Sequence, residues 1–191
     1  MPPRAFPLAL RVGTDICHIP RVHGLLTQSC KLNNGKQSPR LDRLLAKLLT
    51  WPEQQYFWNR FKDKSKAYND SETVLKISRF LAGRWAAKEA CRKACDHLGN
   101  SNGFKSIVIL PVSTTDRTPG EITTRPRGLI LRQALHSPSY TRQHQQVKNW
   151  NHMDIEESDG LYCEISISHD GDYATAVAIV PSTFHFGEMS H

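Results

Sequence analysis

The chain has 191 residues, of which 39% are hydrophobic and 23% charged, a composition typical of a folded domain and not of a disordered chain. The net charge of +7 is uneven, because residues 1–105 hold 19 basic and 8 acidic side chains and residues 106–191 hold 6 and 10; the basic half favours an anionic partner, such as a phosphate compound, an acidic protein or a nucleic acid. No apolar run approaches the roughly 18 residues of a membrane span, and prolines interrupt the N-terminal apolar stretch, so we expect neither a span nor a secretory signal.

The first expected elements are a strand and a short helix. Residues 9–16, ALRVGTDI, have the apolar character of a buried strand that Gly13 interrupts and that ends near Asp15. Residues 40–49 place five leucines at helical spacing, with Arg40, Arg43 and Lys47 on the opposite side.

The longest expected element is a helix from about Glu72 to Leu98. Asn69, three residues before Glu72, predicts a capping box, and Gly99 is a plausible terminator. An apolar stripe runs along this segment, and four alanines permit close packing against another element. The stripe consists of Val74, Ile77, Leu81 and Trp85, and the alanines are Ala86, Ala87, Ala90 and Ala94.

The second half of the chain reads as strands. Residues 105–112 and 126–131 are apolar runs, and residues 162–169 alternate with period two. Asp170-Gly171 then predicts a two-residue turn into a returning strand over 172–180, which places His169 at the end of a hairpin.

This order of elements predicts an α+β fold, with a long helix packed on an antiparallel sheet. We expect a single domain over residues 8–181. Polar segments without periodicity predict insertions at 28–40 and 136–160, and residues 182–191 read as a loose C-terminal tail.

The five cysteines are scattered along the chain, which indicates reduced thiols. Cys91, Cys95 and His97 lie close together in sequence, but their spacing matches no standard zinc pattern. We therefore expect Cys91 and Cys95 on a core-facing side of the long helix.

Three ionisable residues stand out against apolar neighbours. Asp15 follows a buried strand, Glu89 lies among small residues in the long helix, and His169 lies beside the hairpin turn. Two carboxylates from separate elements suit Mg²⁺ held over a phosphate. The alternatives are that Asp15 caps a following turn, that Glu89 forms a surface ion pair with Lys93, and that His169 is structural.

Three longer motifs identify a resemblance. GTDI at 13–16, FLAGRWAAKEACRKA at 80–94 and SISHDGDYATAV at 166–177 resemble, in this order, the holo-acyl-carrier-protein synthase type of 4′-phosphopantetheinyl transferase. The resemblance covers most of residues 11–180. It implies the fold of that family and transfer of 4′-phosphopantetheine from coenzyme A to a serine of an apo acyl carrier protein, with release of adenosine 3′,5′-bisphosphate.

The resemblance also implies site residues. Asp15 and Glu89 correspond to the magnesium ligands, Lys93 to a contact with the coenzyme A phosphates that Lys88 is expected to join, and His169 to a histidine at the nucleotide end. Small relatives are homotrimers with sites between subunits, so Arg84 and His169 are expected to serve a neighbour's site. The candidates for general base are Glu89, a metal-bound water and the His169–Asp170 pair, which the sequence does not rank.

The same resemblance implies an acidic carrier as partner. Arg21 corresponds to an arginine that faces the carrier, and Arg40, Arg43 and Lys47 extend the basic patch or simply form a solvated helix face. The segment DHLGNSNGF retains Gly99 and Gly103 at altered spacing, and the insertions leave a monomer or another assembly open.

Two questions stay open at this stage. The rival interpretation of the basic half is a nucleic-acid-binding module, although no nucleic-acid-binding motif is evident. The resemblance to small fungal synthases suggests a mitochondrial enzyme, with the cytoplasm as the alternative because too few residues precede the first strand for a convincing transit peptide.

Overall fold

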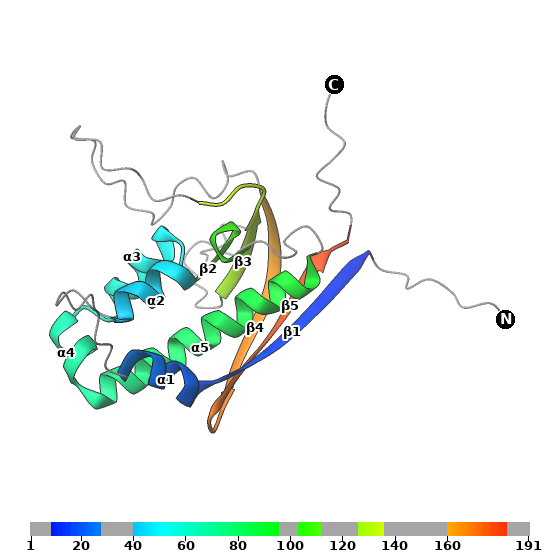
Figure 1. The fold of residues 1–191 in the computed structure, drawn as a ribbon. Coiled ribbons are helices and arrows are strands. Elements are labelled where there is room, and N and C mark those ends of the chain that lie inside the picture. Colours follow the sequence, from blue (N-terminus) through cyan, green and yellow to red (C-terminus); the bar gives the residue numbers. More distant parts are fainter. Residues whose placement is uncertain (1–8, 28–39, 96–102, 112–125, 136–159, 183–191) are drawn as a thin grey trace, which may run out of the picture.

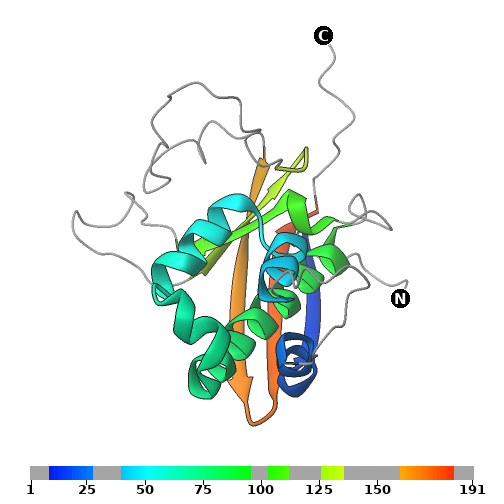
Figure 2. The ribbon, with the colours of Figure 1, turned by 60° about the vertical axis from the view of Figure 1, so that its left-hand side comes forward.

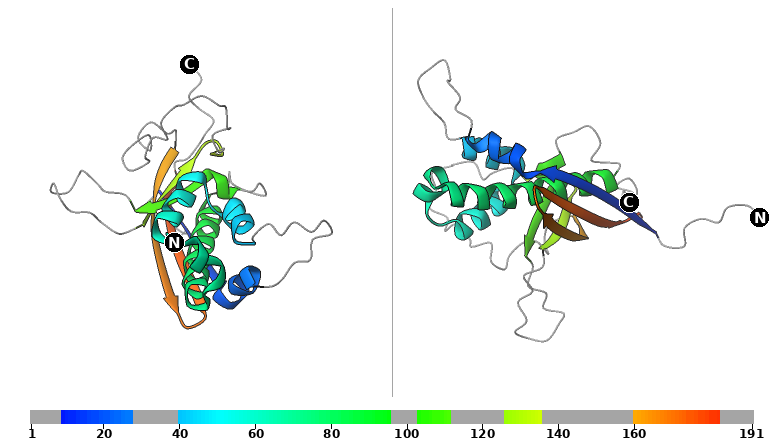
Figure 3. Two further views of the ribbon diagram at one scale, coloured as in Figure 1. Left: turned by 90° about the vertical axis from the view of Figure 1, so that its left-hand side faces the viewer. Right: turned by 90° about the horizontal axis from the view of Figure 1, so that it is seen from below.

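The computed structural model describes residues 9–27, 40–95, 103–111, 126–135 and 160–182, and confirms the α+β fold (Figure 1). Five antiparallel strands form a sheet in the order β1-β5-β4-β3-β2. Their bounds are β1 Leu10–His18, β2 Ile107–Pro111, β3 Pro126–Leu131, β4 Gly160–Asp170 and β5 Tyr173–Pro181. The described helices lie on one face of this sheet (Figure 3).

Five helices and a short 3₁₀ turn cover that face. They are α1 Ile19–Thr27, α2 Arg40–Leu48, α3 Trp51–Arg60, α4 Lys64–Asn69, α5 Ser71–Ala94 and the 3₁₀ helix η2 Gly103–Ser106. The predicted leucine helix is confirmed as α2, which buries four leucines on one side. No helix among the described residues is long and apolar enough to cross a membrane.

The long predicted helix is α5, which lies across the sheet (Figures 1 and 2). The expected capping box at Asn69 is wrong: Asn69 belongs to α4, and Asp70 is the N-cap, accepting a 2.9 Å hydrogen bond from the backbone of Thr73. At its C-terminus α5 ends at Ala94, and Gly99 lies outside the described residues.

Small residues let α5 approach the sheet closely. Ala86, Ala87 and Ala90 are fully buried, as predicted from the alanine pattern. A Cβ atom on Gly13 of β1 would overlap the carbonyl oxygen of Ala90 and lie 2.8 Å from the nitrogen of Ala94. Gly13 therefore sets the distance between β1 and α5.

A buried ion pair connects α5 to α3 and β2. The Nζ of Lys88 donates to Oε2 of Glu53 at 2.6 Å and to the carbonyl oxygens of Phe104 and Ile107 at 2.9 and 2.7 Å. Glu53 also accepts from Thr50 at the start of α3 and from the backbone of Ile109. Each charge thus has several partners, which a buried ion pair needs in order to be tolerated.

The C-terminal hairpin forms as predicted, with its turn one residue later. Asp170 still pairs with Tyr173, so the two turn residues are Gly171 and Asp172 rather than Asp170 and Gly171. Gly171 has a φ of +50°, which explains the glycine at this position. His169 lies at the end of the hairpin, opposite Ala174.

The remaining contacts of α5 with the sheet include buried thiols. Cys91 and Cys163 have their Sγ atoms 3.8 Å apart, and a mutual hydrogen bond together with burial raises the pKa of the Cys91 thiol. Cys17, Cys91, Cys95 and Cys163 are buried and form no disulfide. The core-facing position expected for Cys91 and Cys95 is confirmed, and Cys30 and His97 lie outside the described residues.

The face of the sheet away from the helices is partly apolar. On this face Val12 and Ile16 of β1 are 62% and 63% exposed, and Val177 and Ile179 of β5 lie beside them. Large aliphatic side chains at this exposure, collected on one face, are typical of an interaction surface. We call these four residues the open sheet face.

Candidate active site

Asp15 and Lys93 connect the edge strand to the long helix. The Nζ of Lys93 lies 2.9 Å from Oδ1 of Asp15 and donates to the carbonyl oxygen of Thr14 at 2.9 Å. Asp15 is 17% exposed and Lys93 55% exposed, so the pair opens onto solvent. The predicted strand end near Asp15 is wrong, because β1 continues to His18, and Asp15 therefore caps no turn.

Glu89 precedes Lys93 by one helical turn, on the same side of α5. Its partner is Arg92: Nη1 lies 3.1 Å from Oε1 and 3.3 Å from Oε2 of Glu89. The alternative in which Glu89 pairs with Lys93 is therefore wrong. Two carboxylates, from β1 and from α5, each carry a cation from α5, and we call Asp15, Glu89, Arg92 and Lys93 the carboxylate cluster.

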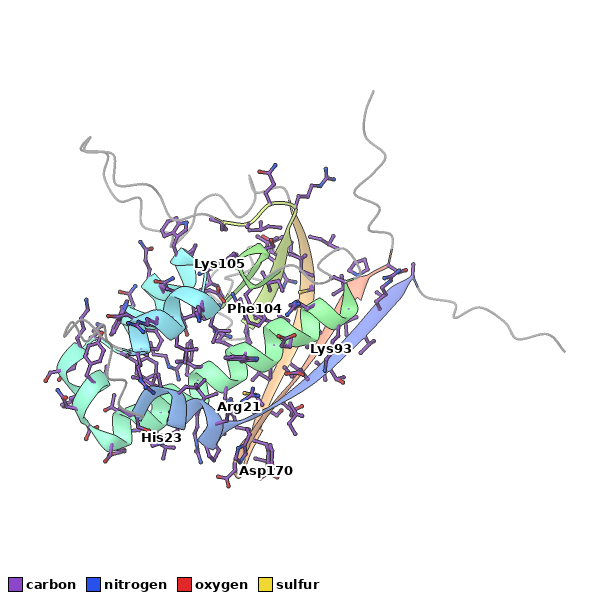
Figure 4. The ribbon with its side chains drawn as sticks, viewed as in Figure 1. Arg21, His23, Lys93, Phe104, Lys105 and Asp170 are labelled. Atoms are coloured by element: carbon purple, nitrogen blue, oxygen red, sulfur yellow. The ribbon has the colours of Figure 1, made fainter. Side chains whose placement is uncertain are left out.

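Aromatic side chains continue this side of α5 toward α1. The Cζ of Arg92 lies 5.6 Å from the centre of the Phe104 ring, which packs edge-on against Trp85 at 6.0 Å. Arg21 of α1 places its Cζ 5.3 Å from the Trp85 ring. Figure 4 shows Arg21, Phe104 and Lys93 around α5. Arg21, which is predicted to face a carrier, is thus connected to Arg92 of the carboxylate cluster through the packed rings of Trp85 and Phe104.

A cavity of about 770 Å³ lies at the other flank of α5. It is bounded by α3, α4, the first half of α5 and the ends of β2, β3 and β4, and Arg84 and His169 both line it. Six lining residues are lysine or arginine and one, Asp63, is acidic. The basic residues are Arg60, Lys62, Lys66, Lys76, Arg79 and Arg84.

Arg84 is the buried cation of this cavity. Its Nε has no hydrogen-bond partner among the described residues, and burial lowers its pKa, an effect that nearby Glu53 partly offsets. The guanidinium carbon lies 4.9 Å from the centre of the Phe80 ring, and Arg60 lies 5.6 Å from the same ring. Because a buried cation without a hydrogen-bonded counter-ion is costly, an anion in the cavity would stabilise it.

His169 faces the cavity from β4. Its Nε2 lies 3.0 Å from the carbonyl oxygen of Arg79, and a Cβ on Gly83 would come within 3.0 Å of the same nitrogen. Asp170 follows within the strand, and consecutive strand residues point to opposite faces. Asp170 therefore does not orient the imidazole, which contradicts the His169–Asp170 pair as a general base.

Lys88 is not available to a phosphate. It is fully buried, and its three donors are used by Glu53, Phe104 and Ile107. Burial lowers the pKa of Lys88, and the adjacent Glu53 carboxylate opposes that shift. The predicted contact with coenzyme A is therefore wrong for Lys88, which instead anchors α5.

The carboxylate cluster suits a divalent cation with oxygen ligands. Asp15 and Glu89 supply carboxylates that are partly exposed, which is the donor chemistry that Mg²⁺ prefers. Within the described ranges, no three His, Cys, Asp or Glu side chains gather into a metal-binding group. A cation here would take its further ligands from water and from a bound phosphate compound.

The remaining predicted docking residues lie on α2, which contacts α1. Arg43 and Lys47 are exposed, and Arg40 at the first position of α2 is half-buried. The predicted insertions at 28–40 and 136–160 lie outside the described residues except for Arg40 and Gly160, as does the predicted tail apart from Ser182.

Sequence reasoning missed Arg92, Glu53 and two residues of the cavity. Arg92 carries a detectable signal, because it stands three positions after Glu89 on a helix. Glu53 completes a Thr-x-x-Glu pattern after Thr50, which predicts a helix start and could have located α3. The cavity residues Arg60 and Phe80 are far apart in sequence and carry no comparable signal.

A model of the 4′-phosphopantetheinyl transferase superfamily matches residues 11–178. The chain is also similar to two curated proteins. It is 27% identical over 179 residues to "4′-phosphopantetheinyl transferase B, mitochondrial" of Aspergillus fumigatus, covering 91% of this chain and 95% of that protein. It is 28% identical over 174 residues to the holo-[acyl-carrier-protein] synthase of Gloeobacter violaceus, covering 91% and 94%.

Among solved structures, the holo-ACP-synthase of Plasmodium yoelii matches with a TM-score of 0.48 and 18% sequence identity. The match covers 89% of this chain and 92% of that one.

Proposed function

The chain belongs to the 4′-phosphopantetheinyl transferase superfamily, and we propose that it transfers the 4′-phosphopantetheine group of coenzyme A to a serine of an apo acyl carrier protein. The observation that carries this proposal is the carboxylate cluster, in which the motifs around Asp15 and Glu89 meet at Lys93. The names of the two curated relatives support the same reaction.

The reaction needs no nucleophile from this chain. The carrier's serine oxygen bonds to the phosphorus that bears pantetheine, and the bond from that phosphorus to the bridging oxygen breaks. Adenosine 3′,5′-bisphosphate leaves, and the serine proton passes to a base, for which Glu89 is the candidate at the carboxylate cluster. Lys93, which is half exposed, is positioned to stabilise charge on phosphate oxygens.

Asp15 and Glu89 would hold magnesium beside the diphosphate of coenzyme A. When bound, the metal supplies positive charge that neutralises the phosphate oxygens. The two carboxylates fit this role because they are oxygen donors on separate, rigid elements whose spacing Gly13 fixes.

The basic cavity at the other flank of α5 would hold the nucleotide end of coenzyme A. Arg84 brings a buried guanidinium whose Nε has no hydrogen-bond partner in the described part of the chain, and His169 brings an imidazole at the cavity wall. Both features favour an anion such as a nucleotide phosphate.

The carboxylate cluster and the basic cavity lie on different sides of α5, which suggests that each active site is built from two copies of the chain. Arg84 and Glu89 are five residues apart on α5, which is about 140° around the helix, so they face different flanks. We infer that the chain is a homotrimer in which the cavity of one copy completes the carboxylate cluster of the next. The open sheet face, with Val12 and Ile16 exposed, supplies an apolar surface for that contact.

The assembly has a direct test. Light scattering should give three times the chain mass. A mixture of the Glu89→Gln and Arg84→Gln proteins, unfolded and refolded together, should regain turnover at limiting coenzyme A, because mixed assemblies contain intact composite sites. A monomer mass, or a mixture no more active than its parts, would contradict the composite site.

The carrier would dock beside the carboxylate cluster through basic residues. Arg21 supports this, because its ring contact with Trp85 places it on the same side of α5 as Glu89 and Lys93. Arg40, Arg43 and Lys47 of the neighbouring α2 would extend the surface toward an acidic carrier.

We propose that the enzyme acts in the mitochondrion, and the name of one similar protein, the mitochondrial transferase of Aspergillus fumigatus, supports this. Fractionation of cells that express the tagged full chain tests this, and recovery in the cytosolic fraction would contradict it.

The experiment for the function is chromatography of the nucleotide product. Incubation with coenzyme A, magnesium and an apo acyl carrier protein should release one adenosine 3′,5′-bisphosphate per carrier. Release that does not depend on the carrier, or no release, would contradict the proposal.

A further inference from the structure

The two carboxylates at the proposed metal site are each neutralised by a residue of α5. Lys93 pairs with Asp15, and the preceding residue, Arg92, pairs with Glu89. The carboxylate cluster therefore holds two negative and two positive side chains. A divalent cation that enters it adds charge to a group that is already neutral.

The geometry of the Arg92 contact matters here. A single nitrogen, Nη1, lies 3.1 and 3.3 Å from the two oxygens of Glu89, so it stands between them, where a cation bound by this carboxylate would stand. Both side chains are 25% exposed, which makes the pair less screened than a surface pair.

Arg92 is held in this position from its other side. Its guanidinium carbon lies 5.6 Å from the centre of the Phe104 ring. The backbone of Phe104 is in turn fixed by the hydrogen bond from buried Lys88 to its carbonyl oxygen. The position of Arg92 beside Glu89 therefore depends on the hydrogen bond from Lys88 to Phe104 as well as on the spacing along the helix.

We propose that Arg92 is a positioning residue that serves as the built-in counter-ion of Glu89 and competes with the divalent cation for it. The proposal rests on the function proposed above, in which Glu89 is a metal ligand. Metal binding releases the guanidinium from Glu89, and the released cation then gains an anionic partner when the diphosphate of coenzyme A is present.

This exchange couples the two ligands. Without coenzyme A, the cation must displace Arg92 with no compensation, so it binds weakly. With coenzyme A, the phosphates offset the added charge, so each ligand strengthens the binding of the other by the same factor. Arg92 thereby favours metal binding together with the substrate over metal binding alone.

The test measures Mn²⁺ binding to the full chain by electron paramagnetic resonance, with and without coenzyme A. Removing one adjacent positive charge in Arg92→Gln should tighten Mn²⁺ binding about three- to tenfold in the absence of coenzyme A. It should also reduce the factor by which coenzyme A strengthens that binding. Equal or weaker Mn²⁺ binding by Arg92→Gln would overturn the proposal.

Three further variants make the result specific. Arg92→Lys keeps the charge and should bind Mn²⁺ much as the parent does; tightening equal to that of Arg92→Gln would overturn the counter-ion role. Arg127→Gln makes the same substitution in the Arg127–Glu164 pair of β3 and β4, which does not line the cavity, and an equal effect there would also overturn it. Glu89→Gln should abolish tight Mn²⁺ binding; if it does not, the metal site of the proposed function fails, whatever Arg92 does.

Discussion

Lys93 of α5 and Asp15 of β1 form a 2.9 Å ion pair near Gly13, where a Cβ atom would overlap the Ala90 carbonyl oxygen of the helix. This contact brings together two of the three sequence motifs of the family, and Glu89 lies one turn away. The proposed chemistry therefore depends on the spacing of α5 and β1.

Gly13→Ala tests that spacing. The added methyl group would overlap the Ala90 carbonyl, so we expect α5 to shift, with a loss of about 1–3 kcal/mol in the free energy of unfolding and a large loss of turnover. Gly160→Ala is the matched control, because its methyl group also meets a backbone oxygen, that of Ile130, but away from the site. Equal turnover by the two variants would mean that the spacing does not control catalysis.

Lys88→Met tests whether Lys88 stabilises the fold or contacts a phosphate of coenzyme A. It leaves the Glu53 carboxylate buried without its cation, so we expect denaturant titration to show a loss of about 3–5 kcal/mol in the free energy of unfolding. The double variant Lys88→Met/Glu53→Gln should recover part of that loss. If stability is unchanged and the KM for coenzyme A rises, Lys88 contacts a phosphate, as the family resemblance implies.

Arg84→Gln addresses the nucleotide end. Loss of the buried guanidinium should raise the KM for coenzyme A about tenfold or more, because a charge-assisted hydrogen bond to a phosphate is lost. Stability should not fall, because the cation that is removed lacks a hydrogen-bonded counter-ion among the described residues. The opposite pattern, an unchanged KM with reduced stability, would assign Arg84 to the fold.

Arg21→Glu examines the docking surface. The charge reversal should raise the KM for the carrier more than the KM for coenzyme A, and the difference should shrink as salt screens the charges. Lys64→Glu reverses an exposed charge on α4 and is the control. Steady-state kinetics in which both KM values are unchanged for Arg21→Glu would rule out carrier docking at this position.

The sequence predicts best those helices and strands in which apolar residues recur at a regular spacing. The leucine spacing of α2, the alanine pattern of α5 and the alternation of β4 and β5 each follow from one buried side. The helices α1, α3 and α4 bury only one to three side chains each, too few to show a period, whereas α2, of similar length, buries four leucines. The turn at Gly171 was misplaced by one residue because strand pairing, which the local sequence does not encode, extends to Asp170.

The sequence predicts which residues belong to the candidate site, but it does not predict which side chains they contact. Family motifs pointed to Asp15, Glu89, Lys93, Arg84 and His169, but two lysines of the same helix, Lys88 and Lys93, differ in burial because of elements distant in sequence. The pairing of Glu89 with Arg92 instead of Lys93 depends likewise on β1, whose Asp15 takes Lys93.

The most direct test of the central claim is the mass of an apo acyl carrier protein after incubation with the chain, coenzyme A and magnesium. We expect mass spectrometry to show one added 4′-phosphopantetheine group, and none with the Glu89→Gln protein, which should fold normally because Glu89 is partly exposed. A carrier left unmodified by the parent chain, or modified at a near-normal rate by Glu89→Gln, would contradict the account.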